Sequence, residues 1–547
     1  MKVNTYILGL ILTISLLSFS CKKDDYNFNT RFAIDTTKVY TDDAYENRIK
    51  DSVWYYYKYL TLWEPVISPA FADIEKMEEE NYLKNNYTKY FQTASDVLGY
   101  LMYMTKASVN GKLVKGNNGS GNNFFFYSDI LYTHNKGESK AYDWYSFLDR
   151  GGFITGSIQQ GYHSGFGMDL VYIQSGSTDK NPKLYVRFVE KNSAAYQAGL
   201  RRGAQITSLN GDKKIDYETQ KAGYFNSLNN YLNSRNLTVE YRNTEGESRT
   251  VNIDYRYNNY ADAIFVDTVL TAGNKKIGYL GLSSFLSTDA WVQDKGQTKS
   301  FQSRMNEAFE GIANKNVQEM VVDLRYNGGG SVTTAEYLGD ILAPMSSSGN
   351  LKFKYKINNI LKELEWDQEG DEFGPTYFSK KGNLNLSRIY FLVSEETASA
   401  SELLINLLAP HMKVYVIGTY KYNNGATIAS NTYGKPVGFF PVEIVSSSNE
   451  LYVTSFQMFN KDGFGDYFDG LKPNSHVWEL DSFKDFGNMD ESMLSAAIYH
   501  INNGVFSNTK NRAVTGSTNF ERKISKDGLK QRKIQGMYKF PNKRIHF

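Results

Sequence analysis

The sequence predicts a multidomain α/β protein, with a small helical N-terminal domain, an α+β domain after it and a larger α/β domain behind both. The chain has 547 residues, which is too long for a single hydrophobic core. Hydrophobic residues make up 41% and charged residues 22%, so most of the chain can fold around buried cores. In the second half, strand-like and helix-like stretches alternate. That alternation favours a largely parallel sheet with functional loops at the strand ends.

The N-terminus has the pattern of an export signal. Residues 1–20 contain a basic start, an apolar stretch and small residues, and Cys21 follows directly before a polar run. Cys21 is the only cysteine, so we expect no intramolecular disulfide. The pattern resembles a bacterial lipoprotein signal, which implies a signal peptide over 1–20, a lipidated Cys21 and a polar tether over 21–45. An ordinary signal peptide that happens to contain a cysteine is the alternative.

If this resemblance holds, the protein is an outer-membrane lipoprotein of the cell envelope, on the periplasmic face or the cell surface, held by its lipid anchor. The net charge of +2 gives no reason to expect a nucleic-acid partner. Residues 506–547 carry eleven Lys and Arg against two acidic residues, which predicts a basic, partly disordered tail. Contact of that tail with anionic surfaces is the alternative.

Three stretches follow the tether. Residues 46–157 begin with apolar residues at helical spacing and continue into a loop region rich in Gly, Asn and Tyr. Residues 158–258 contain strand-like runs, a short helix of small residues and the tight-turn dipeptide Asn210-Gly211. Residues 259–505 carry the alternating strands and helices.

The middle stretch resembles a PDZ domain of the circularly permuted kind found in bacterial proteases. This resemblance implies that Gly165, Phe166, Gly167 and Met168 form a loop whose backbone N–H groups bind a peptide carboxylate, while the peptide adds a strand to the sheet edge. A generic α+β module with turn glycines is the alternative.

A candidate nucleophile lies in "FLVSEETASASELLINLLAP", residues 391–410. Ser399 follows a strand and opens an apolar helix, so negative charge developing on a substrate oxygen would meet the positive end of that helix. Helix capping by Ser399 or Ser401 is the plainer reading, with Ser401 and Thr397 expected to make local hydrogen bonds. None of the six histidines lies where a triad partner is expected. A desolvated lysine can act as the base instead, and Lys435, between a glycine and a proline, is the candidate.

The stretch "DLRYNGGG", residues 323–330, is a strand end followed by glycines that let backbone N–H groups approach another group closely. Asp323 and Arg325 could pair to fix this loop. A phosphate-binding loop is rejected because no lysine follows the glycines. The sequence contains no metal-ligand cluster or nucleotide motif, so we expect no metal and no cofactor.

These segments, in this order, resemble the C-terminal processing peptidases, also called tail-specific proteases, over about residues 160–500. The lipoprotein signal and the helical N-terminal stretch are similar to the exported Bacteroidetes branch of that family. The resemblance implies a serine protease domain of the ClpP/crotonase-like α/β fold over 259–505, a Ser–Lys mechanism and polypeptide substrates. Ser399 would be the nucleophile and Lys435 the general base.

The same resemblance assigns supporting roles. Ala400 would give one oxyanion-binding N–H, and Gly328 or Gly329 the other. Glu402 matches a position that helps to arrange the site. Arg325 and Asp323 match structural charged residues.

One departure concerns the lysine. The family's usual spacing would place it at Asn424, which cannot act as a base. Reading Tyr420–Ser430 as an eleven-residue insertion restores the spacing and puts Lys435 after a glycine; Lys421 is the weaker candidate. A polar third partner of some members is replaced here by Phe439, so we expect a dyad. The alternative function is a catalytically inactive, PDZ-bearing lipoprotein that binds peptides without cutting them.

Overall fold

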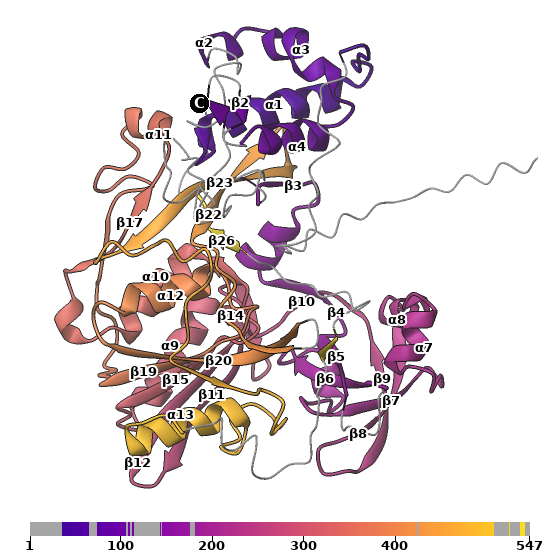
Figure 1. Cartoon of the computed structure of the whole chain (residues 1–547), viewed down its shortest axis with the longest axis vertical. Coiled ribbons are helices and arrows are strands. Elements are labelled where there is room, and N and C mark those ends of the chain that lie inside the picture. Colours follow the sequence, from indigo (N-terminus) through magenta and orange to yellow (C-terminus); the bar gives the residue numbers. More distant parts are fainter. Residues whose placement is uncertain are drawn as a thin grey trace, which may run out of the picture.

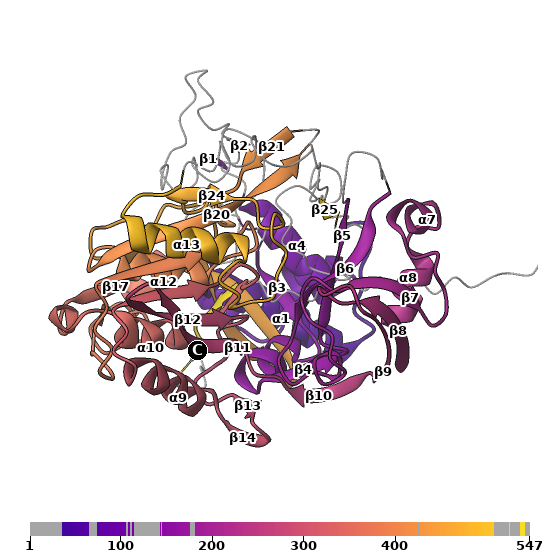
Figure 2. The same ribbon diagram turned by 90° about the horizontal axis from the view of Figure 1, so that it is seen from below.

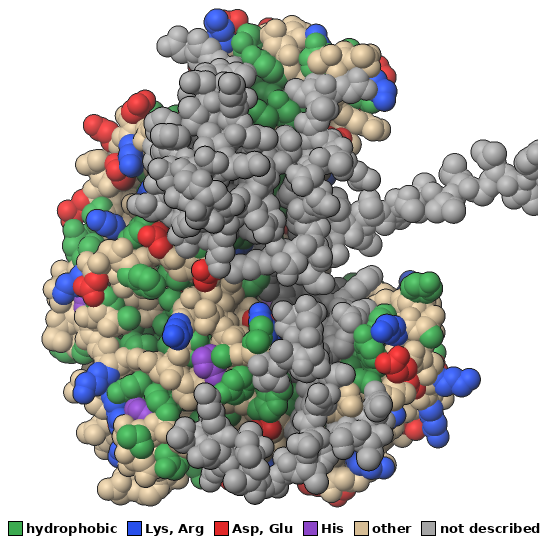
Figure 3. Space-filling view, viewed as in Figure 1, with side chains coloured by type: hydrophobic (Ala, Val, Ile, Leu, Met, Phe, Trp, Pro, Cys, Tyr) green, Lys and Arg blue, Asp and Glu red, His purple; other side chains and the backbone are tan. Residues whose placement is uncertain are grey.

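The computed structural model describes residues 36–64, 74–105, 108–109, 112–113, 143, 145–174, 181–423, 426–507, 524–525 and 536–541. The predicted signal peptide, Cys21 and most of the polar tether lie outside these residues. Within the described ranges, no helix is both long and apolar enough to cross a membrane. On the face drawn in Figure 3, basic and acidic side chains are interspersed over the described surface.

The larger α/β unit is built on a seven-stranded sheet (Figure 1). In spatial order its strands are β11 (Ile264–Ala272), β12 (Lys275–Leu282), β15 (Glu319–Asp323), β19 (Arg388–Leu392), β20 (Lys413–Asn423) and β21 (Ala426–Ala429), with β24 (Ser475–Val477) paired to β20. Strands β12, β15, β19 and β20 run parallel, whereas β11 and β21 are antiparallel to their neighbours. The largely parallel sheet predicted from the alternating sequence is therefore present.

Helices cover both faces of this sheet (Figure 1). They are α9 (Phe301–Ala313), α10 (Val332–Leu342) and α12 (Ala400–Leu408) on one face and α13 (Ser492–Asn503) on the other. Along β15, Met320 and Val322 belong to the core under the first group, and Val321 belongs to the core under α13. Successive strand residues point to opposite faces, so a strand covered on both sides is a continuous apolar run.

A second seven-stranded sheet lies beside this unit. In order its strands are β16 (Gly329–Ser331), β26 (Gly536–Tyr538), β22 (Val437–Ile444), β23 (Ser446–Asn460), β17 (Leu351–Lys356) and β18 (Thr376–Tyr377), with β3 (Phe147–Asp149) paired to β23. The predicted N-terminal helices are present as α1 (Ala44–Leu60) and α4 (Ala94–Met104), with the short helices α2 (Ile74–Met77) and α3 (Tyr82–Asn86). Their apolar side chains, among them Trp54 and Leu101, belong to the same core as Phe439 of β22. The helical N-terminal part thus shares its core with the second sheet.

A third sheet forms a module with its own core of buried side chains. In order its strands are β25 (Ile524–Ser525), β5 (Met168–Ile173), β6 (Lys183–Val189), β7 (Gln205–Leu209), β8 (Asn236–Arg242) and β9 (Ser248–Asp254). Its helices are α6 (Ala194–Gln197), α7 (Tyr217–Ala222) and α8 (Asn226–Leu232). Figure 2 shows α7 and α8 on the side of the module that points away from the larger unit.

Shorter elements complete the described chain: β1 (Ser108–Val109), β2 (Lys112–Leu113), β4 (Tyr162–Gly165), β10 (Arg256–Tyr260), β13 (Trp291–Asp294), β14 (Gln297–Ser300) and α11 (Asn359–Glu363). Two pieces of the stretch predicted as a basic tail, β25 and β26, lie in sheets. The sequence had indicated no role in a sheet for either piece.

Candidate active site

Ser399 stands between β19 and α12 in an uncommon backbone conformation. Its φ is 60° and its ψ is −112°, whereas the residue before a helix ordinarily has extended angles. A non-glycine residue at such a φ costs about 1–3 kcal/mol and persists only where its surroundings enforce it. Its side chain is fully buried, and its Oγ makes no hydrogen bond with any residue in the described part of the chain. Ser208 and Ser284 also have buried hydroxyls without a partner in the described part of the chain, so this state singles out Ser399 only together with its strained backbone and its place before α12.

The hydroxyls of Ser401 and Thr397 make local hydrogen bonds, as the sequence predicted. Ser401 Oγ donates to the carbonyl of Asn327 at 3.0 Å, and Thr397 Oγ1 donates to the carbonyl of Leu324 at 2.7 Å. Both bonds tie the turn before α12 to the loop after β15. Among these three hydroxyls, Ser399 alone is left without a hydrogen-bond partner.

Glu402, in the first turn of α12, is the centre of a buried hydrogen-bond network. Its Oε2 accepts from the backbone N–H of Ser399 at 2.8 Å and of Lys435 at 2.9 Å. Its Oε1 accepts from Gly434 N–H at 2.8 Å and from Thr432 Oγ1 at 2.5 Å. Burial raises the pKa of the Glu402 carboxyl, and these hydrogen bonds act against that rise. Because all four partners donate, the set suits an ionised carboxylate, which only accepts.

Lys435 lies two residues before β22, and its side chain is fully buried. Its Nζ stands over the Phe439 ring at 4.1 Å from the centroid and over the Tyr145 ring at 4.7 Å. Aromatic faces favour a cation, whereas burial favours the neutral amine. Ser399 Oγ has no hydrogen-bond partner, so a Ser399–Lys435 hydrogen bond is not formed in this structure.

The competing base, Lys421, has a different environment. Its side chain is 41% exposed, and its Nζ pairs with Glu395 Oε2 at 3.3 Å. Lys421 thus lacks the burial that the predicted general base needs, which disfavours it for that role.

The predicted insertion Tyr420–Ser430 forms a β-hairpin extension of β20. Within it, Tyr420 pairs with Ala429, and the pairing continues to Asn423 and Ala426. At its base, Ser430 N–H donates to the carbonyl of Thr419 at 3.1 Å. The two ends of the segment therefore lie next to each other. This geometry fits an insertion, because removing the segment would leave the neighbouring strands where they are.

The glycine loop lies directly against the nucleophile. Gly329 has a φ of 114°, and a Cβ built on it would lie 3.0 Å from Ser399 Cβ and 3.1 Å from Ala400 N. The Gly329 N–H donates to Asn327 Oδ1 at 2.9 Å. With that N–H engaged, Ala400, the first residue of α12, and Gly328 are the expected oxyanion donors.

The charged pair predicted for this loop is present and buried. Arg325 binds Asp323 with a closest N–O distance of 2.6 Å and binds Glu491 at 2.6 Å. Tyr279 Oη adds a hydrogen bond to Asp323 at 2.7 Å. Burial acts to lower the pKa of Arg325, but Asp323 and Glu491 together outweigh it and raise that pKa, so the guanidinium stays charged. The pair anchors the loop to β12 and α13.

Charged residues of the third sheet also reach the loops at the site. Arg202 binds Glu479 at 2.9 Å and donates to Tyr326, the residue after Arg325. Arg187 binds Glu396, three residues before Ser399, at 2.7 Å. Sequence reasoning missed these contacts, because nothing in the spacing of the arginines indicates which acids they meet.

The predicted carboxylate-binding loop, Gly165–Met168, joins β4 to β5. Gly167 has a φ of 75°, and a Cβ there would collide with Ser193. Phe166 is buried in the core of the third sheet. The loop therefore stands at the head of β5.

In the described part of the chain, no group of three His, Cys, Asp or Glu residues could hold a metal ion. A strained serine after a parallel strand, a helix N-terminus, a glycine loop and a buried lysine are together typical of a serine-type hydrolase.

The comparisons with known proteins agree with this class. Residues 276–477 match the model of Peptidase family S41. The chain is 25% identical over 254 residues to carboxyl-terminal-processing peptidase 3, chloroplastic, of Arabidopsis thaliana. This alignment covers 46% of this chain and 44% of that protein. The alignment thus spans less than half the length of this relative.

A solved structure has a similar fold. It is the crystal structure of a protein assigned as an S41 protease from Bacteroides fragilis NCTC 9343, with a TM-score of 0.54 and 21% identity. The match covers 86% of this chain and 99% of that one. Residues 276–477 are thus similar to peptidase family S41, in agreement with the resemblance, and the range contains Ser399, Glu402 and Lys435.

Proposed function

We propose that this protein is a serine-type endopeptidase that hydrolyses peptide bonds with a Ser399–Lys435 dyad. The observation that carries the proposal is the buried, unbonded Ser399 Oγ on a strained turn at the start of α12. The S41 match over the same residues supports it. Glu402 ties the backbones of the two proposed catalytic residues to one carboxylate.

The mechanism follows from these positions. Ser399 Oγ attacks the substrate carbonyl carbon while Lys435 Nζ takes the hydroxyl proton. The carbonyl oxygen becomes an oxyanion, stabilised by Ala400 N–H and the N-terminus of α12. The C–N bond then breaks, and Lys435 gives its proton to the leaving amine. Water, deprotonated by Lys435, attacks the acyl carbon, and the proton returns to Ser399 Oγ.

The third sheet is proposed as a PDZ-like module that recognises C-terminal or unfolded segments of exported proteins. Strand β5 and the loop Gly165–Met168 would hold such a segment as an added strand. The proposed location is the cell envelope, with a lipid on Cys21 as the anchor.

A second candidate function is peptide binding without cleavage. The observation that favours it is the missing Ser399–Lys435 hydrogen bond. Catalytic hydrogen bonds are often absent from resting enzymes and form only with substrate, so this observation does not overturn the first proposal.

The test is hydrolysis of fluorescently labelled, unfolded casein by residues 22–547, beside the Ser399→Ala variant. We expect hydrolysis by the parent chain and a loss of at least about 10³-fold in the variant, as for other nucleophile deletions. Hydrolysis that persists in Ser399→Ala would exclude Ser399 as the nucleophile. Absent hydrolysis with intact peptide binding would favour the second function.

A further inference from the structure

A strand from the far end of the sequence lies between the two segments that carry the site. Strand β26 pairs in parallel with β16 of the glycine loop, and Gly536 N–H donates to the carbonyl of Gly328 at 3.0 Å. On its other side it pairs with β22, which follows Lys435, and Lys539 N–H donates to the carbonyl of Phe439 at 3.0 Å. Residues 536–541 thus connect β16, which begins one residue after Gly328, to β22, which begins two residues after Lys435.

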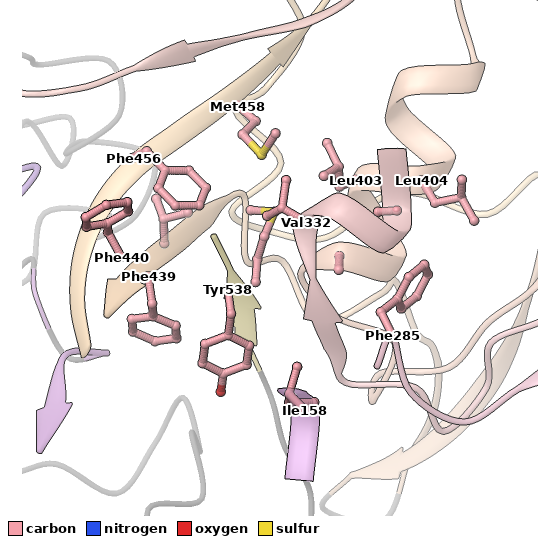
Figure 4. Packing of buried hydrophobic residues seen from close by; sticks show 14 of the residues in the cluster. Ile158, Phe285, Val332, Leu403, Leu404, Phe439, Phe440, Phe456, Met458 and Tyr538 are labelled. Carbon is pink, nitrogen blue, oxygen red and sulfur yellow. The ribbon is translucent and has the colours of Figure 1, made fainter. Parts of the chain in front are cut away.

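This strand passes next to the proposed nucleophile and base. A Cβ built on Gly329 would collide with the carbonyl oxygen of Gly536 and lie 3.0 Å from Ser399 Cβ. The Tyr538 ring stacks on Phe439 with centroids 5.4 Å apart, and the same Phe439 ring lies under Lys435 Nζ. Figure 4 shows Tyr538 beside Phe439, between the strand of Phe439 and the element that carries Val332.

A second piece of the same stretch lies at the other proposed peptide site. Strand β25 pairs antiparallel with β5, with Ile524 opposite Ile173 and Ser525 opposite Tyr172. A peptide bound in the proposed PDZ-like mode would add a strand along this same edge of β5. Two parts of the C-terminal stretch are therefore paired as strands, one beside the proposed catalytic residues and one along β5.

We propose, resting on the peptidase function above, that residues 536–541 are a substrate-like strand that fills the peptide site in cis. The gap between β16 and β22 is then the site for an extended polypeptide passing Ser399, and the chain's own segment must leave it before another polypeptide enters. A strand held by backbone pairing on both sides is the geometry by which sheets recognise extended peptides.

The occupant also indicates which peptides fit. Met537 and Tyr538 are 0% and 1% exposed, so the site accepts an apolar residue followed by an aromatic one. A Cβ on Gly536 would lie 2.6 Å from the Tyr538 ring and 2.9 Å from Phe439, which favours glycine at that position. Lys539 Nζ lies 3.5 Å from Glu372, so a basic residue fits next. The site thus matches extended segments of the order glycine, apolar, aromatic, basic.

The first experiment separates occupancy from catalysis. In residues 22–547 carrying Ser399→Ala, a recognition sequence for a site-specific protease is inserted between residues 528 and 533. The protein folds with its segment in place and is then cut. The probe is a fluorescein-labelled peptide of residues 534–543, with its Tyr538→Ala version and a scrambled version as controls.

We expect the labelled peptide to bind the cut protein at least tenfold more tightly than the uncut protein, because an intramolecular competitor acts at millimolar effective concentration. The Tyr538→Ala and scrambled peptides should bind at least tenfold more weakly. Equal binding before and after cutting would overturn the proposal. Retention of the cut fragment through gel filtration, without exchange against excess peptide, would also overturn it, since the strand would then be a permanent part of the sheet.

The second experiment repeats the cut with Ser399 intact and follows hydrolysis of labelled casein. We expect at least a fivefold rise in rate on cutting, reversed by the unlabelled peptide through a higher KM. Hydrolysis unchanged by cutting would overturn the cis occupancy and leave the peptidase function standing. Peptide binding gained on cutting, with no hydrolysis in any state, would support the occupancy and count against the peptidase function.

Discussion

The backbone N–H groups of Ser399 and Lys435 donate to one oxygen atom, Oε2 of Glu402, at 2.8 and 2.9 Å. These two hydrogen bonds connect the turn before α12 to the segment before β22. A change in the position of this carboxylate would move both proposed catalytic residues at once. Glu402 is therefore a positioning residue, and its effect should be seen through the two residues that it holds.

Glu402→Gln should reduce both stability and activity. The side-chain amide keeps one accepting oxygen, but its NH2 group faces two donors that then have no acceptor. Leaving buried donors unpaired costs about 1–3 kcal/mol each, so we expect about 2–6 kcal/mol less unfolding free energy in urea titrations. The variant disturbs the positions of Ser399 and Lys435 but removes no contact with substrate. The kcat for an unfolded polypeptide should therefore fall, while KM changes less than threefold.

The matched control is Glu395→Gln, in the turn before Ser399. That side chain is 45% exposed and pairs with exposed Lys421, so its loss should cost at most about 1 kcal/mol. Equal losses of kcat in the two variants would show that the loss of a negative charge near Ser399 lowers kcat. The hydrogen-bond network around Glu402 would then not be the cause.

Lys435→Met should abolish hydrolysis without unfolding the protein. Methionine fills the same apolar space between the Phe439 and Tyr145 rings and offers no base. We expect a fall of at least about 10³-fold in kcat, as for loss of other members of a catalytic unit. Lys421→Met removes an exposed lysine as the control and should retain activity within twofold. The reverse pattern would make Lys421 the base and refute the insertion hypothesis.

Deletion of Tyr420–Ser430 should leave the fold intact. Thr419 and Ser430 are joined by a hydrogen bond at the hairpin base, so closing the gap needs little rearrangement. The deletion removes the ring contacts of Tyr420 with His476 and Trp478, and we expect a fall in Tm of up to about 4 °C, on the order of 1 kcal/mol. The hairpin should affect how protein substrates enter, so the cleavage products of casein in mass spectra should change. An unchanged product pattern would exclude that role.

The sequence predicted the elements around the site because their apolar patterns are local. The run before Asp323, the strand before Ser399 and the apolar helix after it are each specified within a dozen residues. The glycine loop was predicted to allow a close approach of the backbone to another group. Gly329 has a φ of 114°, and a Cβ built on it would lie 3.0 Å from Ser399 Cβ. The hydroxyls of Thr397 and Ser401 could also be assigned, because serine and threonine near a helix start bond to neighbouring backbone.

Contacts between distant segments could not be predicted in this way. Thr432 and Tyr145 carry no motif, yet one bonds Glu402 and the other faces Lys435. The strand at Gly536–Tyr538 was missed because three residues in a basic stretch give no strand pattern, and its pairing partners lie on two other segments. Strand pairing depends on which edges the rest of the fold leaves open, and a single sequence does not contain that information.

The pH dependence of stability should carry a contribution from His500. Its buried ring lies in a cluster with Tyr415 and Phe506, and Tyr390 Oη is 2.8 Å from Nδ1. Burial, aided by the nearby Arg388, lowers the pKa of His500 below its ordinary value of 6.5. Between the two pKa values the unfolded chain binds more protons than the folded one. The stability from a neutral His500 is thus complete above about pH 6.5 and is lost as the pH falls below it.

His500→Gln removes this titration while keeping a polar group opposite Tyr390. We expect the unfolding free energy of the parent protein to fall more steeply than that of the variant between pH 7.5 and about pH 5, where histidines titrate. Urea titrations at closely spaced pH values measure the difference, in which contributions from the buried carboxyls and from His411 and His476 cancel. Parallel curves for the two proteins would mean that His500 has the same pKa in the folded and unfolded states.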